Sequence, residues 1–252
     1  MSRLLLLSNS TMPGAPFFQW PSPYVMSFLG KEVKEVVFIP FAAVTFSYDL
    51  YEEKVAAAFA GLGMRVRSLH AVNDKKGMLN NAEAIAVGGG NTFALLSRMY
   101  QEDLLNAVRN KVTGGTPYIG WSAGANLACP TLMTTNDMPV IMPPSFESLH
   151  LIPFQINPHY HELKFENQGG ETRKERLEEF LFMNPEKKVI GLPEGMLLRK
   201  EGSSLTVMGT GTAKLYEYGK AIRDLAAGSD VSFLIGRSEK FKKSEKFKKS
   251  EK

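Results

Sequence analysis

The sequence contains very little cysteine and histidine and no long apolar run. One cysteine among 252 residues excludes a disulfide framework and a zinc site built from cysteines. Four histidines, His70, His150, His159 and His161, leave little material for a dedicated metal centre. No stretch approaches the roughly 18 to 20 apolar residues of a membrane helix, and the apolar run after Arg3 is too short for a signal peptide. We therefore expect a soluble cytoplasmic protein that uses no metal or other cofactor and does not bind membranes.

The excess of basic charge is confined to the C-terminal tail. Of 30 Lys and Arg residues and 26 Asp and Glu residues, eight basic and three acidic residues fall in 237–252. The remaining 22 basic and 23 acidic residues balance, so the body gives no indication of nucleic-acid binding. The tail repeats Ser-Glu-Lys-Phe-Lys-Lys from Ser238 and again from Ser244, and such a charged repeat is typical of disorder. We interpret residues 237–252 as a disordered tag or extension, with a phosphate-binding arm as the alternative.

Short apolar runs alternate with longer helical patterns through the body of the chain. The order strand, helix, strand is typical of βαβ units with a parallel sheet. The predicted strands are Leu4–Leu7, Val36–Ile39, Met64–Leu69, Ala84–Val87, Pro117–Ile119, Leu151–Ile156 and Val189–Leu192, and the predicted helices are about Asp49–Ala60 and Thr92–Lys111. Shorter strands between residues 196 and 218 indicate a small antiparallel edge near the C-terminus. We predict one doubly wound α/β domain over residues 1–236, with a mostly parallel sheet and helices on both faces.

The sharpest local pattern is a G-x-S-x-G segment around Ser122. Gly120-Trp121-Ser122-Ala123-Gly124 follows a predicted strand and precedes small residues that can begin a helix. This is the nucleophile-elbow pattern, in which glycines leave room for a strained central residue whose hydroxyl is exposed at the strand end. The N-terminus of the following helix would offer the Ala123 N–H to an oxyanion. The alternative is a structural serine that caps a helix.

A run of three glycines, residues 88–90, follows another predicted strand. It lacks the spacing of a dinucleotide-binding fingerprint and the lysine of a P-loop, so it indicates phosphate binding only weakly. One crossover helix separates it from the Ser122 strand, and the two strand ends should be neighbours. We therefore expect Gly89 and Gly90 to form an oxyanion hole with Ala123. The alternative is a flexible turn that caps the next helix.

A serine nucleophile requires a general base and a group that orients it. His159 lies directly after a predicted strand, where a base is expected, and His161 is the competitor two residues later. Two carboxylates could hold the histidine in the required tautomer. Asp137 lies in a turn between Ser122 and His159 in the chain, and Glu194 follows a later strand.

Five segments together resemble the peptidase E, or α-aspartyl dipeptidase, family. The segments are Gly88-Gly89-Gly90-Asn91-Thr92, Gly120-Trp121-Ser122-Ala123-Gly124-Ala125-Asn126, Thr134-Thr135-Asn136-Asp137, Ile156-Asn157-Pro158-His159 and Gly170-Glu171-Thr172-Arg173. The resemblance implies a fold like that of class I glutamine amidotransferases, with serine in place of their cysteine. It also implies hydrolysis of dipeptides that begin with aspartate. By position it makes Ser122 the nucleophile, His159 the base and Asp137 the relay acid, with Glu194 matching a carboxylate also proposed for that role.

Specificity for aspartate requires a cation, and Arg173 is the candidate. It follows a glycine-containing loop and begins a helical pattern that runs to Phe182. A guanidinium can bind a carboxylate through two parallel hydrogen bonds, and a first helical turn favours an anion. We assign Arg173 to substrate binding, with Glu194 as a second residue there. The alternative is that Arg173 is one charge on a solvated helix face.

We thus predict a serine dipeptidase that hydrolyses Asp-Xaa through an acyl-enzyme, without metal or cofactor. Its partners would be small peptide substrates, with a homodimer as an open alternative. One rival function is a cyanophycinase-like hydrolase of β-aspartyl linkages on the same scaffold. Another is a non-catalytic module that binds an acidic metabolite.

Overall fold

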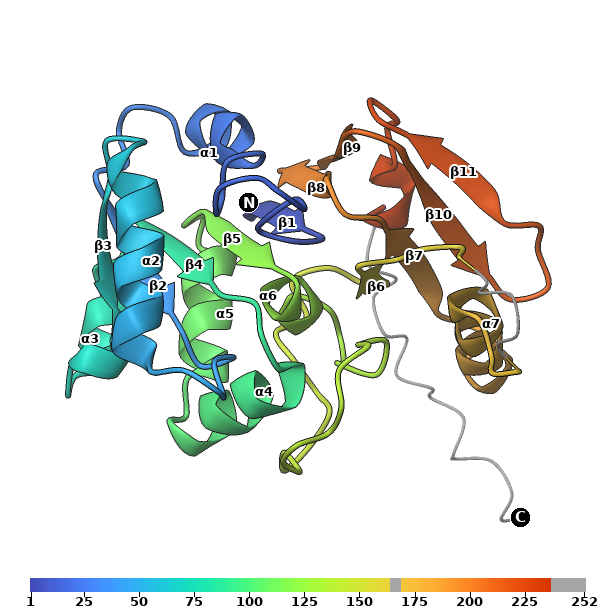
Figure 1. Ribbon diagram of the computed structural model, residues 1–252, viewed down its shortest axis with the longest axis horizontal. Helices are drawn as coiled ribbons and strands as arrows, with labels where there is room; N and C mark the ends of the chain where they lie inside the picture. Colours follow the sequence, from blue (N-terminus) through green and yellow to red (C-terminus); the bar gives the residue numbers. More distant parts are fainter. Residues whose placement is uncertain (164–168, 237–252) are drawn as a thin grey trace, which may run out of the picture.

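The computed structural model describes residues 1–163 and 169–236, so the tail predicted to be disordered lies outside the described residues. The larger of two sheets consists of β1 (Arg3–Leu7), β2 (Glu35–Ile39), β3 (Arg65–Ser68), β4 (Ala84–Val87), β5 (Tyr118–Trp121), β8 (Met196–Glu201) and β9 (Ser204–Gly209). The smaller sheet consists of β6 (Gln155–Pro158), β7 (Lys188–Leu192), β10 (Thr212–Glu217) and β11 (Arg223–Ala226). Figure 1 shows the two sheets side by side.

The larger sheet has the strand order β3-β2-β4-β5-β1-β8-β9. Its first five strands run parallel, whereas β8 is antiparallel to β1 and β9 is antiparallel to β8. The apolar runs that predicted strands form β1, β2, β4 and β5, whose side chains are almost all buried. A strand that is buried on both faces has a continuous apolar sequence, as is usual for the parallel strands of α/β proteins. The predicted α/β class is confirmed.

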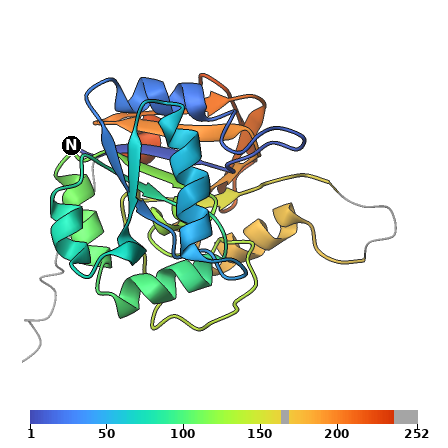
Figure 2. The ribbon, with the colours of Figure 1, turned by 60° about the vertical axis from the view of Figure 1, so that its left-hand side comes forward.

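The leucines of β1 show how the two faces are covered. Leu4 and Leu6 belong to one buried core, and Leu5 and Leu7 belong to another. The first core includes residues of α3 (Lys75–Asn80), α4 (Thr92–Gln101), α5 (Leu105–Thr113) and α6 (Ala123–Leu127), and the second includes residues of α1 (Ser22–Leu29) and α2 (Tyr48–Ala60). Helices therefore cover both faces, as predicted (Figures 1 and 2).

The smaller sheet differs from the prediction. Its order is β11-β10-β7-β6, with β6 parallel to β7 and the other pairs antiparallel. The strand predicted at Leu151–Ile156 begins only at Gln155, because the amides of Leu151 and Ile152 donate to the Ala128 carbonyl instead of to a strand. Helix α7 (Arg173–Met183) packs on this sheet. The last strands therefore divide between two sheets: β8 and β9 extend the larger one, and β10 and β11 complete the smaller one.

The helix predicted at Thr92–Lys111 is interrupted. Asp103 has a φ of 51°, and the Leu104 amide donates to the Met99 carbonyl, which ends α4. The interruption places the Leu104 side chain, fully buried, in the core. Within the part of the chain that the structure describes, no helix is long and apolar enough to cross a membrane.

Candidate active site

Ser122 lies at the junction of β5 and α6 in a strained backbone conformation. Its φ and ψ are 53° and −111°, a combination that a non-glycine residue adopts only when its surroundings enforce it. The flanking glycines enforce it by close packing. A Cβ on Gly120 would lie 2.3 Å from the Gly124 carbonyl oxygen, and a Cβ on Gly124 would lie 2.2 Å from the Val87 carbonyl oxygen. The predicted elbow is thus present at Ser122.

His159 lies within hydrogen-bond distance of the Ser122 hydroxyl. The distance from His159 Nε2 to Ser122 Oγ is 2.9 Å. His159 follows β6 directly and has a φ of 52°, so its backbone also lies in a rarely used region. The His159 amide donates to Ser8 Oγ at 2.8 Å, and the Ser8 hydroxyl donates to the Leu192 carbonyl at 2.8 Å. This buried serine fixes the backbone that carries the imidazole.

Glu194 is the carboxylate in contact with His159. Its Oε1 lies 2.6 Å from His159 Nδ1, on the side of the ring opposite Ser122. The residue follows β7, and the next amide, that of Gly195, donates to Asn9 Oδ1 at 2.9 Å. A turn held in this way brings the carboxylate to the imidazole.

Asp137 occupies a different position from the one predicted for an orienting acid. Its carboxylate accepts hydrogen bonds from the Thr92 amide, at 2.7 Å, and from the Thr92 hydroxyl. Thr92 begins α4, where free N–H groups and the helix dipole favour an anion. In the structure Asp137 thus binds the start of α4, and the carboxylate that contacts the imidazole is that of Glu194.

Of the three residues predicted for the oxyanion hole, Gly89 and Ala123 adjoin the serine and Gly90 lines the same pocket. A Cβ on Gly89 would lie 3.0 Å from the Ser122 Cβ, so only glycine permits this approach. Gly90 has a φ of 133°, and Ala123 is the first residue of α6. Within the described residues, the N–H groups of Gly89, Gly90 and Ala123 have no hydrogen-bond partner. They remain available to a developing oxyanion.

Gly89, Gly90, Ser122 and His159 line one pocket of about 600 Å³. The lining residues come from the ends of β1, β4, β5 and β6, from α2 and from adjoining loops: Asn9, Ser10, Thr11, Phe17, Phe46, Leu50, Tyr51, Lys54, Gly89, Gly90, Trp121, Ser122, Asp137 and His159. Open α/β sheets bind ligands at the carboxyl ends of their strands, where this pocket lies. The pocket residues contributed by α2 were not predicted from the sequence.

Arg173 lies outside the lining of this pocket. It follows the N-cap Thr172, whose capping box with Glu175 fixes the start of α7. The Arg173 Nε lies 3.5 Å from His161 Nε2. Burial lowers the pKa of the Arg173 guanidinium and the charge of Arg176 adds to this, while the charge of Asp137 opposes it. Burial and the neighbouring charge of Arg173 lower the pKa of His161.

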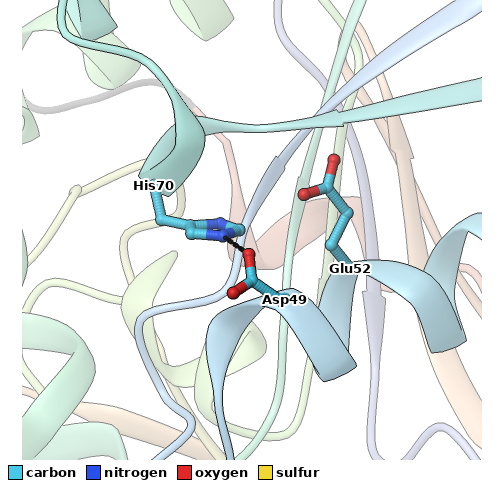
Figure 3. Close-up of side chains that lie close together, drawn as sticks. All are labelled: Asp49, Glu52 and His70. Atoms are coloured by element: carbon cyan, nitrogen blue, oxygen red, sulfur yellow. Dashed lines mark hydrogen bonds and ion pairs between the residues drawn. The ribbon is translucent and has the colours of Figure 1, made fainter.

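The other two histidines have their own carboxylate partners. His150 Nε2 bonds Glu147, and His70 Nε2 lies 2.8 Å from Asp49 Oδ1 (Figure 3). Within residues 1–163 and 169–236, the one group whose ligand atoms could surround a metal ion is Asp49, Glu52 and His70, with those atoms within 4.8 Å of one another. Hydrogen bonds account for its arrangement, because Ser68 Oγ contacts His70 Nδ1 and the Ser68 amide donates to Glu52.

Comparisons with known proteins identify the family of this chain and similar folds. The model of peptidase family S51 matches residues 4–208. Peptidase E of Nostoc sp. is 48% identical over 236 residues, which are 94% of this chain and 98% of that protein. Peptidase E of Actinobacillus pleuropneumoniae is 46% identical over 83% of this chain and 90% of its own. The crystal structure of a peptidase from an acI-B1 Actinobacterium, at 19% identity, superposes with a TM-score of 0.70 over 92% of this chain and 97% of its own.

The match with the family model extends over more than half of the chain, and the chain belongs to peptidase family S51. The resemblance to peptidase E and the predicted class, a serine-type peptidase, are thereby confirmed.

Proposed function

We propose that the protein is a serine dipeptidase that releases aspartate from the N-terminus of Asp-Xaa dipeptides, with Ser122, His159 and Glu194 as its catalytic triad. The observation that carries this proposal is the position of the imidazole. His159 bridges the Ser122 hydroxyl at 2.9 Å and the Glu194 carboxylate at 2.6 Å through its two ring nitrogens. A nucleophile, a base and an orienting acid in this order define a triad by geometry.

The reaction follows from the position of each group. Ser122 Oγ attacks the carbonyl carbon of the N-terminal aspartate while its proton passes to His159 Nε2. The N–H groups of Gly89, Gly90 and Ala123 stabilise the oxyanion of the tetrahedral intermediate. The imidazolium returns the proton to the leaving amine, and the C–N bond breaks to give an acyl-enzyme. Water, deprotonated by His159, then attacks the ester, and the imidazolium returns that proton to Ser122 Oγ as the acyl C–O bond breaks and aspartate is released.

The acid is assigned to Glu194, in place of Asp137. A carboxylate on Nδ1 holds the imidazole in the tautomer whose Nε2 accepts the serine proton, and it stabilises the cation that forms. Glu194 is positioned for both tasks. Its sequence-based assignment to substrate binding is therefore replaced by a catalytic one in this proposal.

Two charged residues are proposed to recognise the aspartyl residue. Asp137 lines the pocket with Ser122 and is held by Thr92, so its carboxylate can receive the α-ammonium group of a dipeptide. Arg173 is retained as the cation for the aspartate side chain. Its charge is close enough to interact with that of Asp137, although it lies outside the pocket lining in this conformation. The N-terminal aspartate of the substrate carries a positive α-ammonium group and a negative side-chain carboxylate. A site that binds both groups needs a negative and a positive side chain close to each other.

A panel of dipeptides tests this function. Asp-Leu should be hydrolysed much faster than Asn-Leu, Glu-Leu or Ala-Leu, with free aspartate as a product. The β-linked dipeptide β-Asp-Arg separates the proposal from a β-aspartyl hydrolase, and faster cleavage of that substrate would contradict our assignment. A serine-reactive organophosphonate should label Ser122, whereas a non-catalytic binding module would remain unlabelled.

Small peptides are the substrates that the family supports. A cytoplasmic location and homodimer formation remain proposals. The single cysteine, Cys129, is buried and free, and burial raises the pKa of its thiol to about 12. An unreactive thiol of this kind suits a protein that is not built on disulfides.

A further inference from the structure

One end of the active-site pocket is apolar and carries a single positive side chain. Phe17, Phe46 and Leu50 line this end together with Lys54. None of these four residues belongs to the triad or to the proposed aspartate-binding groups. We call them the α2 end of the pocket, because Leu50 and Lys54 project from α2.

Tyr51 ties the α2 end to the catalytic serine. Its hydroxyl donates to the Gly89 carbonyl at 3.0 Å and accepts from Trp121 Nε1 at 3.0 Å, and Trp121 directly precedes Ser122. Residues three and four apart share a helix face, so Lys54 follows Tyr51 one turn further along the same face. At about 1.5 Å per residue, this step is about 4.5 Å along the helix axis. Lys54 therefore lies on the same face of α2 as Tyr51, one turn further along the helix, and lines the same pocket as Ser122.

The Lys54 ammonium has no carboxylate partner among residues 1–163 and 169–236. Its only charge-related contact there is with the face of Phe17, whose ring centroid lies 4.5 Å from Nζ. Phe46 packs edge-on against Tyr51, with ring centroids 5.3 Å apart, and lines the same pocket as Lys54. The α2 end therefore presents an unpaired cation next to an apolar surface.

The charges of the pocket match those of a free dipeptide. Asp137 contributes a carboxylate from the wall formed by the start of α4, and Lys54 contributes an ammonium group from the wall formed by α2. A dipeptide has an α-ammonium group at one end and an α-carboxylate at the other, with the scissile bond between them. Ser122 lies in the same pocket as both charged residues.

We propose that Lys54 binds the α-carboxylate of the leaving residue and that Phe17, Phe46 and Leu50 contact its side chain. The proposal rests on the proposed dipeptidase function and identifies what selects dipeptides over longer peptides. Lys54 would bind the negative C-terminal carboxylate of the dipeptide. The apolar side chains beside Lys54 would favour an apolar leaving residue such as leucine. Larger peptides place an uncharged amide where the carboxylate is expected.

The test compares Asp-Leu with Asp-Leu amide, which differ only in the charge of the C-terminal group. Lys54→Met keeps most of the side-chain volume and removes the charge. It should lower kcat/KM for Asp-Leu about tenfold and leave kcat/KM for the amide nearly unchanged, so the preference for the free carboxylate is lost. Lys54→Arg should restore most of that preference, because it restores the charge. Thermal melting of each variant serves as the folding control.

Each other outcome overturns the proposal in a recognisable way. An unchanged ratio of Asp-Leu to Asp-Leu amide in Lys54→Met would show that Lys54 does not bind the carboxylate. If the variant instead loses its preference for Asp-Leu over Asn-Leu, then Lys54 reads the aspartate side chain and not the C-terminus. If the wild-type enzyme hydrolyses neither aspartyl substrate, the dipeptidase function fails and this subsite fails with it.

Discussion

The two sheets contribute different halves of the proposed catalytic site. The larger sheet carries the proposed nucleophile and oxyanion groups, at the end of β5 and in the glycine loop after β4. The smaller sheet carries the proposed base and acid, which follow the parallel neighbours β6 and β7. The active site is therefore assembled where the two sheets meet. Neither sheet alone brings a serine hydroxyl, an imidazole and a carboxylate within hydrogen-bond distance of one another.

The residues that follow β1 join the two halves. Ser8 binds the His159 amide and the Leu192 carbonyl, and Asn9 binds the Gly195 amide. Both side chains are almost completely buried. Buried hydrogen bonds of this kind are costly to lose because each leaves an unsatisfied partner. The segment that follows β1 in the larger sheet thus positions His159 and Glu194, which follow strands of the smaller one.

The largest expected effect comes from removing the contribution of the larger sheet. Ser122→Ala should lower kcat for Asp-Leu by at least about 10³-fold, because only binding and oxyanion stabilisation remain. Steady-state kinetics on protein with an unchanged melting temperature would measure this. Near-normal turnover by the folded variant would rule out a serine mechanism.

Removing the acid tests the contribution of the smaller sheet. Glu194→Gln should lower kcat by about 10²-fold or more, because the amide can stabilise the wrong imidazole tautomer and cannot balance its positive charge. Asp137→Asn is the matched control and should mainly raise KM for Asp-Leu, because its carboxylate is assigned to the substrate's ammonium group. If Asp137→Asn abolishes turnover while Glu194→Gln retains most of it, the two roles must be exchanged.

Recognition of the aspartate side chain should depend on Arg173. Arg173→Ala is expected to cut kcat/KM for Asp-Leu by roughly 10²-fold, equivalent to about 3 kcal/mol of transition-state binding. Arg173→Lys should restore activity only partly, because an ammonium group keeps the charge and loses the planar fork. The ratio of Asp-Leu to Asn-Leu hydrolysis is the decisive measurement, and a ratio that survives Arg173→Ala would assign this role to another residue.

The smallest effect is expected at the connection between the sheets. Ser8→Ala leaves the His159 amide and the Leu192 carbonyl without their partner, which should cost about 1–3 kcal/mol in the free energy of unfolding. We also expect a loss of about tenfold in kcat as the imidazole backbone loses its support. Ser203→Ala, in the exposed turn between β8 and β9, is the control and should change neither quantity. A Ser8→Ala enzyme with wild-type kcat would show that other contacts position His159.

The sequence was most informative where a local pattern determines local geometry. The elbow around Ser122 and the glycine loop near Gly89 follow from short motifs between a strand and a helix, and the structure contains both. The position of His159 after a strand was also sufficient to select it over His161. These features depend on residues that are neighbours in the chain.

Chain order did not decide between the two acids or reveal the second sheet. Asp137 and Glu194 both lie in loops near predicted strands, and only the parallel pairing of β6 with β7 brings Glu194 beside His159. Strand pairing depends on tertiary packing, which short apolar runs do not encode. Ser8 could have been suspected, because a polar residue follows the apolar run of β1 directly, but its partners lie more than 150 residues away.

The packing around the elbow affects how the chemistry of this fold can change. Gly120 and Gly124 are held against main-chain atoms, so the direction of the side chain at position 122 is set by the backbone and not by the side chain itself. Exchange of the Ser122 hydroxyl for a thiol would change the nucleophile while keeping its attack trajectory. A scaffold built in this way can acquire a different acyl-transfer chemistry through one atom, whereas a methyl group on either glycine would disrupt the trajectory for every nucleophile.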